Sequence, residues 1–185
     1  MTLLRLSLPL LAAALLAACA SAPIEQRYYL LRSDYQTTTR ALDPSSYRLG
    51  PISVAPYIDR AGLLLETAEG QIRPARNHLW AEPVQEGVRA FLAAEISAAY
   101  GRDILPLDPL AKGNIIRVRI DQLHGTLDGH AKLVAYWSLT EGDQTLVAEQ
   151  FADTLPIGSD GYAALAEAQK SLLGDLARNI AAQLK

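Results

Sequence analysis

The chain has 185 residues, half of them hydrophobic, and its 20 acidic residues outnumber its 17 basic residues to give a net charge of −3. This length is sufficient for one domain with a hydrophobic core. No Lys/Arg-rich tract is present, which argues against a nucleic-acid partner, because such proteins need a basic face to neutralise phosphates. The single cysteine, Cys19, excludes a disulfide within the chain.

The first 18 residues have the three-part layout of a secretory signal peptide. Arg5 supplies a positive charge, an apolar run extends from Leu6 to Leu16, and small residues follow. The apolar run is too short to span a bilayer, which takes roughly 20 apolar residues in a helix. We therefore predict that residues 1–18 are a cleaved lipoprotein signal peptide.

The end of this segment resembles the lipobox of bacterial lipoproteins, in the run Leu16-Ala17-Ala18-Cys19. The resemblance implies cleavage between Ala18 and Cys19 and attachment of a diacylglycerol to the Cys19 thiol. Two or more acyl chains give lasting anchorage to a membrane, whereas one chain binds only marginally. The alternative is an ordinary secretory signal followed by an incidental cysteine.

Residues 19–26 are interpreted as a lipidated tether. Ala20 and Ser21 stand where lipoproteins retained at the inner membrane commonly have an aspartate. By this resemblance, we expect the protein to lie in the bacterial cell envelope, anchored to the outer membrane and facing the periplasm.

Residues 27–185 are predicted to form one domain that begins with strands. The segments with the aromatic and aliphatic character of strands are Arg27–Arg32, Tyr47–Val54 and two hairpin arms at Leu63–Leu65 and Ile72. Gly50-Pro51 marks a bulge or a strand edge. Glu69-Gly70 lies between the hairpin arms and is typical of a tight turn.

The first helix of the domain is predicted between Pro83 and Gly101. Glu82 and Pro83 are typical of a first helical turn, and a glycine such as Gly101 is typical of a helix end. Apolar residues recur at steps of three and four positions, at Val84, Val88, Phe91, Leu92 and Ile96. We expect the resulting apolar face to cover a sheet.

A three-strand meander is predicted next. It starts where apolar and polar residues alternate from Ile116 to Asp121. Asp128-Gly129 is typical of a two-residue hairpin turn and leads into Lys132–Leu139. A second turn at Glu141-Gly142-Asp143 leads into Thr145–Phe151.

The last helix is predicted to begin near Ser159-Asp160, and its apolar stripe from Tyr162 to Leu184 is wide enough for a main core element. Strands, a helix, a meander and a closing helix indicate an α+β fold with two layers. We expect a mixed or antiparallel sheet with the two main helices packed on one face. The pattern leaves the strand order open.

No catalytic or cofactor-binding motif is recognisable in the sequence. His78, His124 and His130 lack the helical spacing and the neighbouring acids of a metal site. No serine lies in a G-x-S-x-G elbow, and glycine-rich phosphate loops are missing. We therefore expect a non-enzymatic protein with no cofactor and no metal ion.

Segments around the first helix together resemble a known family. These segments are Tyr28-Tyr29-Leu30, Gly50–Val54, Pro56-Tyr57, Asp59-Arg60 and Trp80-Ala81-Glu82-Pro83. They resemble the ABC-type transport auxiliary lipoprotein family, from about residue 27 to the C-terminus. The resemblance implies an auxiliary lipoprotein that works beside an MCE-domain protein and an ABC transporter permease and ATPase. Such systems move lipids or other hydrophobic compounds between the two membranes.

The same segments supply candidates for partner contacts, which are Tyr57, Asp59, Arg60, Trp80, Glu82 and Pro83. For Trp80 and Tyr57 a position in the core is the favoured alternative, because both residue types are common there. For Asp59 and Arg60 the alternative is a solvated turn. Assembly into a homo-oligomer is left open.

A second function is compatible with the residues. The wide apolar stripe of the last helix also suits an envelope lipoprotein that itself binds a lipid or a small hydrophobic ligand between sheet and helices.

Overall fold

The computed structural model describes residues 25–35, 47–106, 113–159 and 161–184. The predicted signal peptide, the cleavage site at Ala18 and the predicted lipidation site at Cys19 lie outside these residues. The described elements, in chain order, are β1 (Arg27–Tyr29), β2 (Arg48–Val54), β3 (Gly62–Ala68), β4 (Gln71–Trp80), α2 (Val84–Tyr100), β5 (Leu105–Pro106), β6 (Asn114–Gly125), β7 (His130–Glu141), β8 (Gln144–Pro156) and α3 (Tyr162–Ala182).

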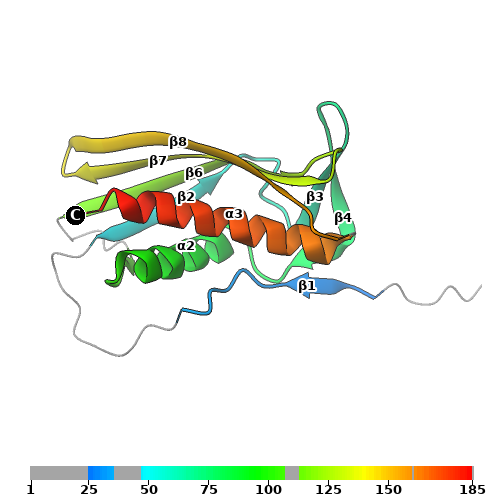
Figure 1. The fold of residues 1–185 in the computed structure, drawn as a ribbon, viewed down its shortest axis with the longest axis horizontal. Coiled ribbons are helices and arrows are strands. Elements are labelled where there is room, and N and C mark those ends of the chain that lie inside the picture. The colour runs from blue at the N-terminus through cyan, green and yellow to red at the C-terminus, as the bar shows by residue number, and fades with distance from the viewer. Residues whose placement is uncertain (1–24, 36–46, 107–112, 160, 185) are drawn as a thin grey trace, which may run out of the picture.

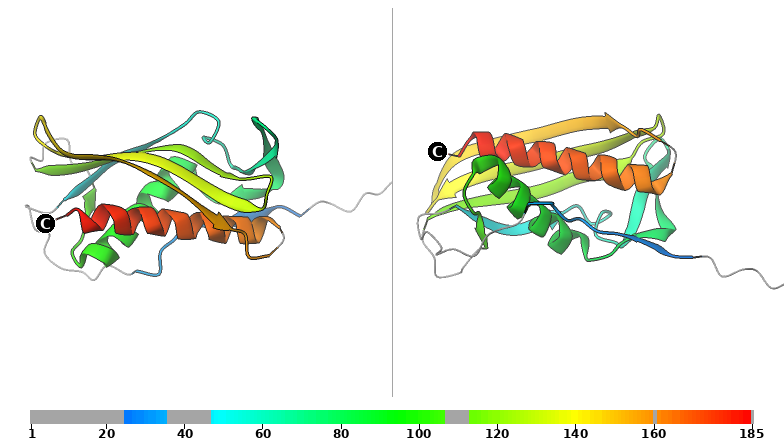
Figure 2. Two further views of the ribbon diagram at one scale, coloured as in Figure 1. Left: turned by 45° about the horizontal axis from the view of Figure 1, so that its top comes forward. Right: turned by 60° about the horizontal axis from the view of Figure 1, so that its bottom comes forward.

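The described strands form one mixed sheet, and both helices lie on the same face of it (Figure 1). The two further views in Figure 2 show the opposite face of the sheet without a helix. The predicted α+β class with two layers and helices on one face is confirmed. No helix in the described ranges has the length and hydropathy that crossing a membrane requires.

Strand β6 is the centre of the sheet. Along one edge it pairs antiparallel with β7, which in turn pairs with β8, as the predicted meander requires. Along its other edge it pairs in parallel with β2 and then contacts β3 where Leu65 is opposite Gly125. The β3–β4 hairpin is antiparallel, and β1 adds to β4 in parallel with Tyr28 opposite Leu79.

Helix α2 has the limits that the sequence predicted. It begins directly after Pro83 and ends at Tyr100, and Gly101 has the left-handed φ of 77° that a helix end favours. The Gly101 N–H donates to the Ser97 carbonyl at 2.9 Å. Helix α3 begins at Tyr162, later than the predicted start near Ser159-Asp160, and Gly161 precedes its first turn without a side-chain capping hydrogen bond.

The core lies between the sheet and the two helices. Its most deeply buried large side chains include Leu92, Ile96, Ile116, Ile120, Leu133, Leu172, Leu173, Leu176 and Ile180. Each buried leucine or isoleucine contributes about 1.5–3 kcal/mol relative to an exposed one. The apolar stripe of α3 is therefore buried in the core of the domain itself.

Candidate functional site

The segments that carry the family resemblance meet at one corner of the domain. Here the loop between β2 and β3 (residues 55–61) lies beside the junction between β4 and α2. The Trp80 N–H donates to the Ala61 carbonyl at 2.7 Å, and the Ala81 N–H donates to the Tyr29 carbonyl at 2.8 Å. Three segments that are distant in sequence thus form one continuous surface.

Four of the predicted contact residues lie on this surface, which we call the junction surface and define as Asp59, Arg60, Glu82 and Pro83. Three of them, Asp59, Arg60 and Pro83, are exposed, and Glu82 is partly exposed. The fold therefore brings these candidates together, as a binding surface requires.

The charged groups of the junction surface are only loosely paired. The Asp59 carboxylate accepts a hydrogen bond from Gln85 Nε2 at 3.3 Å. Glu82 forms an ion pair with Arg32, whose side chain is half exposed. Exposed ion pairs of this kind add at most about 1 kcal/mol to stability, so these groups can exchange partners at small cost. Arg60 makes no ion pair within the described residues.

Trp80 supports the junction surface from inside. Its side chain is 6% exposed and belongs to the hydrophobic core, which is the alternative that the sequence favoured for it. Trp137 also lies in the core, where it is 3% exposed and donates from Nε1 to Asn179 Oδ1 at 3.0 Å.

Tyr57 points from the β2–β3 loop toward β6. Its hydroxyl lies 3.1 Å from Nδ1 of His124. Burial raises the pKa of Tyr57 and lowers the pKa of His124, so both groups are neutral near pH 7. The phenol and the neutral imidazole therefore share one hydrogen bond, whose direction follows the imidazole tautomer. Tyr57 thus fixes the loop to the sheet, in agreement with a largely structural position.

The three histidines occupy separate environments. The His78 ring stacks between the rings of Tyr29 and Tyr162. His124 is hydrogen-bonded to Tyr57. Nδ1 of His130 lies 3.3 Å from Oδ2 of Asp128. In the described part of the chain, no three His, Cys, Asp or Glu side chains are grouped as metal ligands would be.

The helix-free face of the sheet carries a hollow that the sequence did not reveal. Its volume is about 680 Å³, and its lining includes Ser53, Arg117, Arg119, Tyr136 and Glu149. Both arginines already have partners: Arg117 donates to Thr140 at 2.7 Å, and Arg119 pairs with Asp121 at 3.0 Å. The alternation of residues 116–121 predicts which side chains face outward, but which strands lie side by side follows only from the fold.

Comparison with known proteins identifies relatives along nearly the whole chain. "Intermembrane transport lipoprotein PqiC" from Escherichia coli (strain K12) is 26% identical over 179 residues, which are 95% of this chain and 95% of PqiC. The PqiC of Shigella flexneri gives the same values.

Two crystal structures share the fold. An uncharacterised protein superimposes with a TM-score of 0.76 at 22% identity, covering 88% of this chain and 100% of that one. A protein from Xanthomonas campestris superimposes with a TM-score of 0.64 at 13% identity, covering 86% of this chain and 91% of that one.

The sequence model of one family, described as the ABC-type transport auxiliary lipoprotein component, matches residues 28–181. This range starts within β1 and ends within α3, one residue short of each element's outer end, so it covers nearly all of the described fold. The chain therefore belongs to the ABC-type transport auxiliary lipoprotein component family.

Proposed function

We propose that this protein is a lipid-anchored, non-enzymatic auxiliary component of an MCE/ABC-type system that moves lipids or other hydrophobic compounds between the inner and outer membranes. The observation that carries the proposal is the agreement with an intermembrane transport lipoprotein over 95% of both chains. The family match over residues 28–181 supports it. Residues 27–185 are the auxiliary domain in this proposal.

The anchor is the diacylglycerol on the Cys19 thiol, and the signal peptide is cleaved between Ala18 and Cys19. The lipobox-like run Leu16–Cys19 supports this assignment. Residues 19–26 then connect the lipid to the start of β1. With Ala20 and Ser21 after the cysteine, the favoured location is the outer membrane, with the domain in the periplasm.

The junction surface is the proposed contact for the MCE-domain protein. Its loop is held in place by Ile58, which is 2% exposed, and by the backbone hydrogen bond from Ile58 N–H to the Ala55 carbonyl at 2.8 Å. A held loop with exposed groups of both signs suits a polar protein interface, because little ordering is needed on binding. The proposed task of the domain is docking, and the ATPase of the system supplies the energy.

Cys19→Ser tests the anchor. We expect the variant to leave the membrane fraction as a soluble protein or to keep its signal peptide, because serine provides no thiol for the diacylglycerol. Cell fractionation and intact-mass measurement give the result, and Ser21→Ala is the matched control that should remain anchored. A wild-type protein with an unmodified thiol would contradict the proposal.

Affinity purification tests the partners. Wild-type protein taken from solubilised membranes should recover an MCE-domain protein together with an ABC permease and ATPase. Arg60→Glu should reduce this recovery, since it reverses a charge on the junction surface. Arg117→Glu makes the same charge reversal on the helix-free face of the sheet and should leave the recovery unchanged. Wild-type protein that recovers none of these components would refute the proposed role.

A further inference from the structure

A small apolar pocket opens at the start of α3. Its volume is about 180 Å³, and its apolar lining consists of Leu65, Ile157, Tyr162 and Leu165. A cavity of about 150 Å³ with similar lining binds a molecule the size of benzene. The pocket therefore has room for a short stretch of an acyl chain, but not for a whole chain.

A basic pocket adjoins the apolar one and shares Tyr162 with it. It is lined by Arg73, Pro74, Ala75, Arg76 and Tyr162. Both arginines are exposed, and within the described residues neither side chain has an ion pair or a hydrogen bond. Guanidinium groups bind phosphate oxygens through paired hydrogen bonds, so two unpaired arginines that line one pocket suit a phosphate.

Tyr162, the residue that lines both pockets, is held rigidly. The Tyr162 ring stacks on His78 with ring centroids 4.5 Å apart and planes at 23°. His78 in turn stacks on Tyr29, whose hydroxyl lies 2.8 Å from His78 Nδ1. Three aromatic rings from β1, β4 and α3 are thus locked together. A site that is already ordered loses less conformational entropy when a ligand binds.

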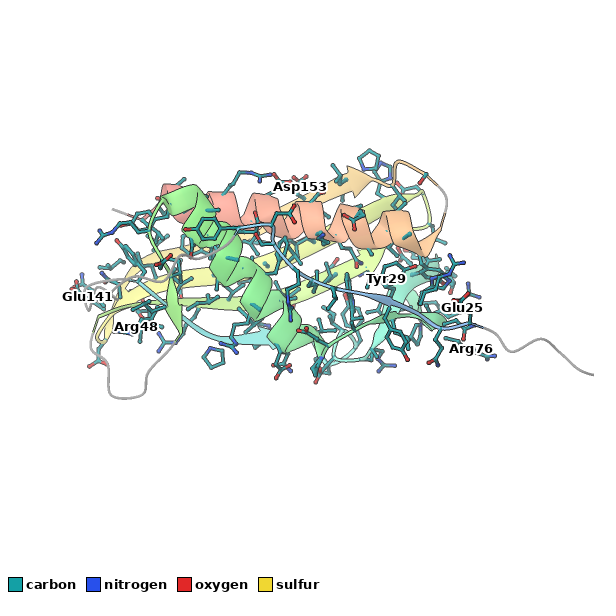
Figure 3. All side chains as sticks on the ribbon, turned by 90° about the horizontal axis from the view of Figure 1, so that it is seen from below. Glu25, Tyr29, Arg48, Arg76, Glu141 and Asp153 are labelled. Carbon is teal, nitrogen blue, oxygen red and sulfur yellow. The ribbon has the colours of Figure 1, made fainter. Side chains whose placement is uncertain are left out.

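These pockets lie at the end of the domain from which the anchor would extend. Figure 3 shows Arg76 and Glu25 together at the end where the chain enters β1. Glu25 is six positions after Cys19, and a fully extended segment of that length spans about 20 Å. If Cys19 carries the proposed lipid, the pockets lie within reach of the membrane surface.

We propose that the two pockets form one binding site for an anionic phospholipid of the membrane that holds the anchor. Arg73 and Arg76 bind the phosphate, and the adjoining part of one acyl chain lies against Ile157 and Leu165. Tyr162 separates the polar half of the lipid from its apolar half. The inference rests on the proposed function only for the nearness of the membrane, since the pockets themselves do not depend on Cys19.

Native mass spectrometry of the full chain in detergent tests the site, with dioctanoyl phosphatidylglycerol as the added lipid. We expect one bound lipid per chain. The double variant Arg73→Gln, Arg76→Gln should bind it about tenfold or more weakly, because two charge-assisted contacts are lost. The double variant Arg117→Gln, Arg119→Gln removes the same charge from the sheet-face hollow and should bind like wild type.

Two further ligands distinguish the contribution of the basic pocket from that of the apolar pocket. Dioctanoyl phosphatidylcholine should bind more weakly, because its choline cation offsets the phosphate charge. Glycerol 3-phosphate should also bind more weakly, because it has no acyl chain. Equal binding of the two lipids, or loss of binding in the Arg117/Arg119 variant instead, would overturn the inference. Recovery of transport partners is a separate measurement, so failure of the site and failure of the proposed function are distinguishable.

Discussion

His124 is a titratable side chain inside the sheet, only 7% exposed, next to Tyr57. Burial is the main reason that its pKa is lowered from the ordinary value of 6.5, while Glu66 acts in the opposite direction and Lys132 adds to the lowering. The unfolded chain therefore takes up a proton at a higher pH than the folded domain does. The stabilisation from neutral His124 is complete above about pH 6.5 and is lost as the pH falls through the lowered pKa.

We expect the free energy of unfolding to decrease as the pH falls below about 6.5 and the substitution His124→Gln to lessen this decrease. Glutamine can still form a hydrogen bond with the Tyr57 hydroxyl, so the packing of the loop is largely kept. Urea unfolding at a series of pH values measures the effect. His130→Gln retains His124 and should retain the pH-dependent loss. An identical pH dependence in wild type and His124→Gln would show that another group is responsible.

Individual site residues were predictable where a local pattern carried the information. Trp80 and Pro83 stand out at the helix start, and the structure brings the exposed candidates together on the junction surface. Arg73 and Arg76 lie a few positions before Trp80 in the chain, but their relation to a ligand depends on Tyr162, far along the chain. No local pattern connects them, because a pocket is made by tertiary packing.

At the scale of the elements, local signals account for what could be predicted. The proline and glycine at the two ends of α2 each act over a few residues, and the structure agrees with them. The Asp128-Gly129 signal also marks the position of the turn between β6 and β7, but the connection is longer than the two residues predicted. Strand β6 ends at Gly125 and β7 begins at His130, and the Gly129 N–H donates to the Thr126 carbonyl at 3.3 Å. The parallel pairing of β2 with β6 was not predictable, since alternation shows which face a side chain takes and not which strand lies beside it. Strand β5 has two residues and leaves no period to detect.

The β3–β4 hairpin, which carries both pocket arginines, depends on close contact at Gly62. A Cβ at this position would lie 2.4 Å from the carbonyl oxygen of Ala75, a backbone atom that cannot turn aside. We expect Gly62→Ala to lower the free energy of unfolding by about 1–3 kcal/mol, as overpacking does elsewhere. Urea or thermal unfolding gives this value directly.

Gly158→Ala is the matched control, because a Cβ there meets nothing within 4 Å and the residue does not have a left-handed φ. Its stability should stay within about 0.5 kcal/mol of wild type. If Gly62→Ala were as stable as this control, the hairpin would have to shift to accept the added Cβ, at the register irregularity between Gly62 and Leu64.

At the scale of the whole molecule, β1 joins the proposed anchor to the domain. It pairs in parallel with β4, and Leu31, just beyond it, is 4% exposed. Leu31 lies against Gly87 of α2, where a Cβ would come within 3.5 Å of the leucine side chain. The next described strand begins only at Arg48. β1 and Leu31 therefore determine where the N-terminal segment leaves the domain, beside the pockets at Tyr162.

We expect Leu31→Ala to release β1 while the rest of the domain stays folded. Truncating a buried leucine costs about 2–5 kcal/mol, and a loss of about 2 kcal/mol raises the population of a locally opened state about thirtyfold. Trypsin cleaves after Arg27 and Arg32, at a rate that follows this population. Limited proteolysis with mass spectrometry should therefore detect faster release of the N-terminal peptide.

Leu30→Ala, which truncates the neighbouring side chain that is 53% exposed, should be cleaved at the wild-type rate. Faster cleavage throughout Leu31→Ala would mean that β1 and the rest of the domain unfold together. Equal cleavage of all three proteins would mean that Leu31 does not hold β1. β1 would then be held by its other contacts, which are its parallel pairing with β4 and the stacking of Tyr29 on His78.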